Sequence, residues 1–99
     1  MAFIRMSVMA PRSGKEEALT KLLDRLVQYF QDKPGRIAAY RISADPHLKD
    51  KRVGRISIWE SEKDANRMSS DQHGLALQAE IKLLAVDTSP EEHSFTGTQ

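Results

Sequence analysis

The chain contains no cysteine, which excludes disulfide bonds, thiolate nucleophiles and thiolate metal ligands. Its three Phe, two Tyr and one Trp are too few to form the stacking platforms on which RNA-binding modules hold bases. Fifteen Lys and Arg stand against fourteen Asp and Glu, so no concentrated positive charge indicates a nucleic-acid partner. No apolar run approaches membrane-spanning length and the N-terminus lacks the layout of a signal peptide, so we expect a cytoplasmic protein without a membrane partner.

The length of 99 residues predicts a single domain over residues 1–99. A chain of this size buries an adequate but small core, so self-association that covers more apolar surface would stabilise it. The three histidines have no cysteine partner and no spacing typical of metal ligands, and no glycine-rich phosphate loop or nucleophile elbow is present. We therefore expect no bound metal, no nucleotide cofactor and no serine hydrolase chemistry.

The periodicity of the apolar residues predicts a strand, a helix, two strands, a pair of helices and a last strand. The four strands are expected at residues 3–9, 36–44, 52–60 and 91–96. This order is typical of the ferredoxin-like plan, an α+β fold in which a four-stranded antiparallel sheet carries its helices on one face.

Helix starts are predicted from capping signatures. Ser13 with Glu16 fits a capping box before the long helix, and Ser61 with Asp64 repeats the signature before a short one. A further helix is expected after His73.

Each of two strands divides into an aliphatic and a mixed face. The aliphatic faces, expected to meet the helices, carry Ile4, Met6, Val8, Ile56 and Ile58. The mixed faces, expected on the open side of the sheet, carry Phe3, Arg5, Ser7, Met9, Arg55, Ser57 and Trp59. This mixed face is too apolar for a solvent surface and too polar for a dry core. It therefore predicts a homodimer packed sheet to sheet around a cavity with apolar and polar walls, and small-molecule sites usually have walls of this kind.

These features together resemble the antibiotic-biosynthesis monooxygenase family within the dimeric α+β barrel superfamily. The residues that carry the resemblance are the N-terminal strand and helix, Pro34-Gly35, Tyr40-Arg41-Ile42, Ile58-Trp59-Glu60-Ser61, Ala65, Ser70, His73 and Glu91-Glu92-His93-Ser94-Phe95. The resemblance implies a dimeric α+β barrel and cofactor-free oxidation of aromatic or quinol-like substrates with O₂. Met68 stands where many relatives carry His or Trp, which weakens a haem-degrading alternative.

Within this resemblance, His73 is the candidate base, since an imidazole titrates near neutral pH, and Arg55 is the candidate partner of a substrate anion. Trp59 is the candidate pocket wall, and the other candidate substrate contacts are Phe3, Arg5, Ser7, Met9 and Ser57. Each has a structural reading beside the functional one: His73 as a residue of a helix-helix turn, Trp59 as packing, and the arginines as salt-bridge partners.

Two functions follow as hypotheses. The first is a cofactor-independent monooxygenase for a small aromatic substrate. The second is a non-catalytic dimer that binds a metabolite or has only a structural role, because one fold hosts both classes. The position of His73 discriminates between them: catalysis by His73 requires it inside the cavity, whereas the binding module allows it to face solvent.

Overall fold

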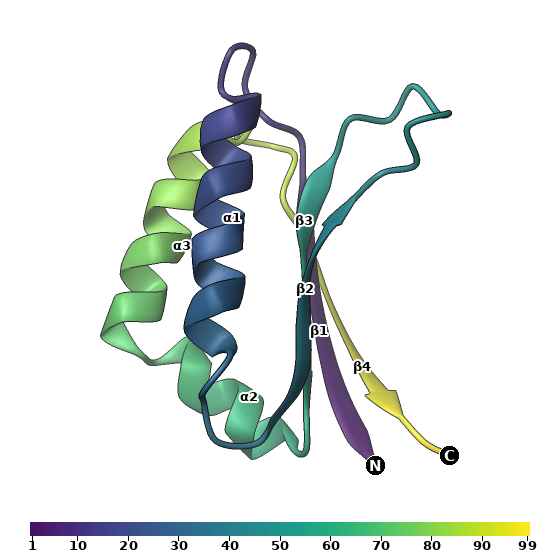
Figure 1. Cartoon of the computed structure of the whole chain (residues 1–99), viewed down its shortest axis with the longest axis vertical. Helices are drawn as coiled ribbons and strands as arrows, with labels where there is room; N and C mark the ends of the chain where they lie inside the picture. Colours follow the sequence, from purple (N-terminus) through teal and green to yellow (C-terminus); the bar gives the residue numbers. More distant parts are fainter.

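The computed structural model describes residues 1–99 and contains one four-stranded sheet with three helices on one of its faces (Figure 1). The elements are β1 Ala2–Met9, α1 Glu16–Phe30, β2 Arg36–Ser43, β3 Val53–Trp59, α2 Glu62–Ser69, α3 Gln72–Leu84 and β4 Glu91–Gly97. All pairings are antiparallel and the strand order is β2-β3-β1-β4. The ferredoxin-like fold predicted from the sequence is confirmed. No helix is both long and apolar enough to cross a membrane.

The helix starts agree only in part with the capping signatures. Ser61 caps α2, because its hydroxyl accepts a hydrogen bond from the Asp64 amide at 3.2 Å. The prediction for Ser13 was wrong: α1 begins at Glu16 without any side-chain cap. At α3, Asp71 is the cap, so His73 lies in the first turn of this helix instead of before it.

The prediction of which sheet face meets the helices was wrong. The mixed face lies against the helix layer, where Trp59 and Ser57 are each 1% exposed and Ser7 is 5% exposed. The strand register places Phe3 opposite Trp59 and Arg5 opposite Ser57 on this face. Alternation along a strand separates two faces but does not identify which one is covered, because that depends on what the helices offer as packing partners.

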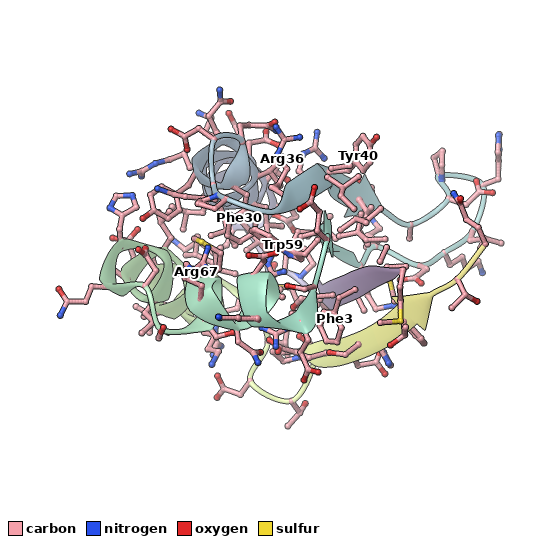
Figure 2. The ribbon with its side chains drawn as sticks, turned by 90° about the horizontal axis from the view of Figure 1, so that it is seen from below. Phe3, Phe30, Arg36, Tyr40, Trp59 and Arg67 are labelled. Atoms are coloured by element: carbon pink, nitrogen blue, oxygen red, sulfur yellow. The ribbon has the colours of Figure 1, made fainter.

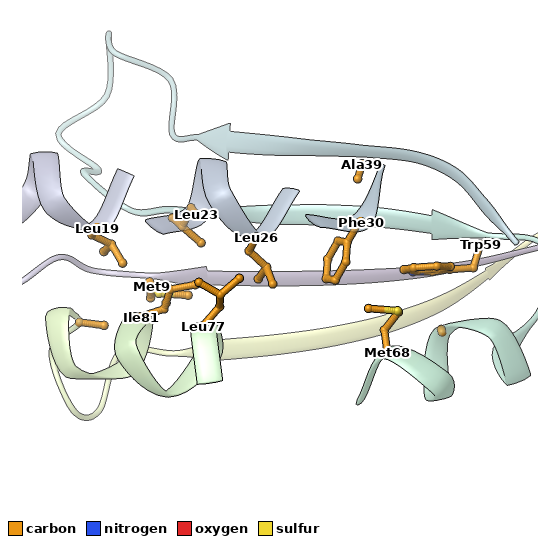
Figure 3. Packing of buried hydrophobic residues seen from close by; sticks show 12 residues of the cluster. Met9, Leu19, Leu23, Leu26, Phe30, Ala39, Trp59, Met68, Leu77 and Ile81 are labelled. Carbon is orange, nitrogen blue, oxygen red and sulfur yellow. The ribbon is translucent and has the colours of Figure 1, made fainter. Parts of the chain in front are cut away.

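The core that fills the space between the layers is built around this mixed face (Figure 3). Four buried residues of α1 point at the sheet: Leu19, Leu23, Leu26 and Phe30. Phe30 meets Trp59 edge to face, with 5.6 Å between ring centroids. Met68 of α2 and Leu77 and Ile81 of α3 close the core from the other helices.

The aliphatic face is therefore the open side of the sheet. It combines side chains from all four strands, half-buried or exposed, and we call it the open sheet face: Ile4, Met6, Val8, Ala38, Tyr40, Ile42, Ile56, Ile58 and Phe95. Tyr40 is 59% exposed and Phe95 52% exposed. No helix covers this face (Figure 1).

Candidate functional site

Three adjoining hollows lie along the mixed face of the sheet, between it and the helices. The outer hollow, which we call the mouth, has a volume of about 330 Å³ and is bordered by β4, α2 and α3. Two inner recesses have about 20 Å³ each, close to the room that one water molecule needs. The first recess lies beside Ser7 and Met9 and the second beside Trp59 and Met68. Arg55 and Gln78 line all three hollows and so mark the centre of the site.

Arg55 is a half-buried cation without an anionic partner. It takes part in none of the ion pairs of the chain, and the hydrogen bonds of the chain include none from its guanidinium. Since no fully buried polar side-chain atom lacks a partner, the Arg55 nitrogens must open toward solvent through the hollows. Its guanidinium lies 5.5 Å from the centre of the Phe30 ring. Burial lowers the pKa of Arg55, the charge of Arg5 adds to this effect, and Glu92 opposes it.

Arg5 crosses from β1 to α2 and is held there by neutral acceptors. Its guanidinium donates to the Ala65 carbonyl at 3.3 Å, to the Ser69 hydroxyl and to the Asn66 side-chain oxygen. Arg5 borders both the mouth and the recess at Trp59, so it stands where the two meet. No carboxylate neutralises its charge.

The remaining candidate contacts divide between the hollows and the core. Ser7 and Met9 line the first recess, and Ser57 and Trp59 line the second. Trp59 packs beside Phe30 between the helices and the strands (Figure 2), so it serves as core and as pocket wall together. Phe3 lines none of the three hollows, and its ring lies 5.4 Å from the Arg5 guanidinium.

His73 lies outside the hollows, on the outer surface of the helix layer. Its exposed ring is 4.4 Å from the ring of Tyr29. The Tyr29 hydroxyl donates to Asp71 at 2.5 Å, and the same carboxylate accepts from the Gly74 amide at 2.9 Å. These two hydrogen bonds lower the pKa of Asp71, and the bond to Asp71 raises the pKa of Tyr29. The structural reading, a residue of the helix-helix turn, describes this position of His73.

Two polar residues of the site were missed from the sequence. Gln78 follows the buried Leu77 and precedes the buried Ile81 by three residues, so its helical phase was the signal that a polar side chain faces the sheet. Glu92 lines the first recess and the mouth, and His93 lines the mouth. The His93 ring stacks on Phe95 with 6.1 Å between centroids. No group of three His, Cys, Asp or Glu is placed to hold a metal ion.

Fold and cavity together define a ferredoxin-like α+β protein with a mixed pocket between its sheet and its helices. No family model matches the sequence, and no curated protein matches it. Solved structures do match over nearly the full length. SnoaB from Streptomyces nogalater, a cofactor-independent oxygenase, has 16% identity and a TM-score of 0.82, over 99% of this chain and 94% of its own.

Two further structures extend this likeness. Rv0793 from Mycobacterium tuberculosis has 13% identity and a TM-score of 0.86, over 100% of this chain and 97% of its own. A candidate antibiotic biosynthesis monooxygenase from Nitrosomonas europaea has 12% identity and a TM-score of 0.84, over 97% of this chain and 89% of its own. The resemblance to this family, predicted from the sequence, is confirmed in the fold.

Proposed function

We propose that the protein is a cofactor-independent monooxygenase that oxidises a small aromatic, quinol-like substrate with O₂. The observation that carries the proposal is Arg55, an unpaired and partly desolvated cation at the centre of a cavity with apolar and hydroxyl walls. The oxygenase activity of SnoaB, which has the same fold, supports this class of reaction. The mouth, at about 330 Å³, lies in the size range of small-molecule pockets.

The reaction begins with a substrate anion, and the positive charges of Arg5 and Arg55 stabilise such an anion. A phenolic hydroxyl has a pKa of about 10, and an opposite charge within hydrogen-bond distance lowers such a pKa by about 1–3 units. The substrate anion then passes electrons to O₂. The substrate loses two hydrogens, one from a ring carbon and one from the hydroxyl group, and that ring carbon gains one oxygen atom as a quinone carbonyl. The other oxygen atom leaves as water, and the substrate supplies all four electrons.

The proton of the hydroxyl leaves toward the mouth, where the exposed Glu92 stands beside solvent. His73 has no part in this proposal, because its ring lies on the outer surface against Tyr29. Arg55 keeps the role expected from the sequence, as the partner of the substrate anion. Ser7, Ser57, Met9 and Trp59 supply the walls of the recesses.

We further propose a homodimer in which a second copy covers the open sheet face. The isolated chain buries only 16 of its 99 residues, although nine apolar side chains gather on that face. A stable dimer interface buries about 800 Å² on each partner, which a four-stranded sheet can supply. Ile56→Lys, at the centre of the face, is expected to give monomers in sedimentation velocity. A wild type that sediments as a monomer at micromolar concentration would contradict the proposal.

The second candidate is a non-catalytic binding module on the same dimer. It is favoured by the exposed His73 and by inner recesses of only about 20 Å³, which hold water but no aromatic ring. On this reading the mouth binds a metabolite without turnover.

Oxygen uptake with a panel of quinols and polyphenols tests the two functions. We expect the wild type, His73→Ala and Arg41→Gln to consume oxygen equally, and Arg55→Gln to lose about 10- to 100-fold in rate. Arg41 is a matched control because it is paired opposite Arg55 in the sheet but is bound to Asp24 at 2.6 Å. Absence of uptake in every protein would favour the binding module. A loss in His73→Ala alone would overturn the role given to Arg55.

A further inference from the structure

The hollows around Arg55 hold more positive charge than the chain neutralises. Arg55 has no ion-pair partner, and Arg5 donates only to a carbonyl, a hydroxyl and an amide oxygen. Glu92 is the one carboxylate among the lining residues, and it is exposed and more than the 4.0 Å of an ion pair from either arginine. Other arginines of the fold, such as Arg12, Arg41 and Arg52, each have a carboxylate within 2.9 Å.

We propose that the ligand of this cavity is an aromatic acid, with its carboxylate held by Arg55 beside Arg5 and its ring in the mouth. This inference rests on the proposed function for the site, and it adds a permanent anionic group to the ligand. A carboxylate takes two of the five N–H donors of Arg55 and leaves others for the oxygen that becomes charged during reaction.

The donors of Arg55 favour a carboxylate over a phenolate. A guanidinium presents its N–H groups as a planar fork, and a carboxylate accepts two of them in parallel. A phenolate has one oxygen and cannot match the fork. An anion that takes the place of solvent at Arg55 therefore gains most interaction free energy when it carries two oxygens in one plane.

The space beside that carboxylate suits an aromatic ring, because the mouth has a volume of about 330 Å³. The Arg55 guanidinium already lies 5.5 Å from the centre of the Phe30 ring, so the cation has one aromatic neighbour within the protein. Met9, Leu23 and Leu26 form the apolar wall of the first recess, which has room for a small substituent of the ring, while the ring itself lies in the mouth. Gln78, which reaches all three hollows, offers an amide that can donate to or accept from a ring hydroxyl.

Isothermal titration calorimetry in oxygen-free buffer tests the inference without turnover. The probes are benzoate, 4-hydroxybenzoate and 2-naphthoate, each compared with its primary amide, and acetate as a simple anion. The proteins are the wild type, Arg55→Gln, Arg5→Gln and the matched control Arg41→Gln, all checked for folding by circular dichroism.

We expect at least one aromatic acid to bind the wild type at least about 10-fold more tightly than its amide. Arg55→Gln is expected to weaken the acid by about 10- to 100-fold and to change the amide by less than about twofold. Arg5→Gln is expected to weaken the acid less than Arg55→Gln does, and Arg41→Gln to leave its binding unchanged.

The inference is overturned if the amides bind as tightly as the acids, or if Arg55→Gln binds the acid like the wild type. It is also overturned if no acid binds below about 5 mM, or if acetate binds as tightly as naphthoate, which would mark a simple anion site. Failure of the proposed function is a separate outcome: acids then bind through Arg55 while no substrate supports oxygen uptake. Equal oxygen uptake with neutral and acidic quinols would remove the inference and leave the function.

Discussion

Replacing Arg55 by methionine should make the protein more stable while it removes the anion site. A charged group taken partly out of water without a partner costs free energy. Even for buried charges that are paired, replacement by apolar residues is often neutral or stabilises a protein by about 1–4 kcal/mol. The Arg55 guanidinium is half-buried and keeps contact with solvent through the hollows. We therefore expect its replacement to raise the free energy of unfolding by about 1–2 kcal/mol from this effect.

One contact acts in the opposite direction. The cation–π contact of Arg55 with Phe30, at 5.5 Å from the ring centre, contributes about 0.5–1 kcal/mol that the variant loses. A methionine sulfur beside the same ring restores part of it. The net gain is then about 1 kcal/mol, which for a domain of this size raises the midpoint of thermal unfolding by about 4–8 °C.

The assay is thermal and urea unfolding followed by far-ultraviolet circular dichroism, at one fixed protein concentration because association shifts apparent stability. Arg41→Met is the control: its ion pair with Asp24 is largely exposed, so the variant should change the unfolding free energy by less than about 0.5 kcal/mol. If Arg55→Met instead lowers the unfolding free energy by about 1 kcal/mol or more while the control does not, Arg55 is bonded in the folded protein and is not an unpaired cation.

Three further outcomes follow from the packing and the hydrogen bonds. Trp59→Ala should lose about 3–5 kcal/mol, since a residue that is 1% exposed leaves a cavity beside Phe30; because Trp59 is the only tryptophan, urea unfolding must be read by circular dichroism. Gly54→Ala should cost about 3 kcal/mol or more, because its Cβ would lie 1.8 Å from the Ser7 carbonyl oxygen; a soluble variant with wild-type urea midpoint would contradict the β1–β3 register. The pKa of Asp71 is lowered in the folded state, so its contribution to stability is complete above the unfolded pKa of about 4 and is lost as the pH falls through the lower folded pKa; between about pH 5 and pH 2 the wild type should therefore lose more stability than Asp71→Asn, and parallel urea midpoints for the two proteins would refute this.

The order and type of the elements could be predicted from the sequence because they depend on local patterns. Period-two alternation marked the strands, and the Ser61–Asp64 signature marked the start of α2. The Ser13 cap failed because Gly14, at a φ of 80°, turns the chain before α1 begins, so Lys15 occupies the N-cap position. A capping signature predicts a helix start only where the backbone between its two residues is already helical.

Most of the candidate residues lie together, but on the other side of the sheet from the one expected. Arg5, Ser7, Arg55 and Trp59 do share one face of the sheet and border the hollows, as their common phase indicates. The sequence placed that face away from the helices, because aliphatic residues were assumed to fill the core. His73 was a candidate by its chemistry, and the alternative left open beside it, a residue of the helix-helix turn, describes its position on the outside against Tyr29.

The reversed faces have a physical consequence for function. A sheet built for stability alone would turn its isoleucines toward the helices and its serines and arginines toward water. Here Ser7, Ser57 and the Arg55 guanidinium lie inside, at a cost in desolvation, while Ile56 and Ile58 remain on the open sheet face. Local rules fail most often at functional sites, where a polar interior is retained for binding or chemistry. The interior polar face therefore supports a ligand site, and the apolar face left outside supports a second copy that offsets the stability lost within each protomer.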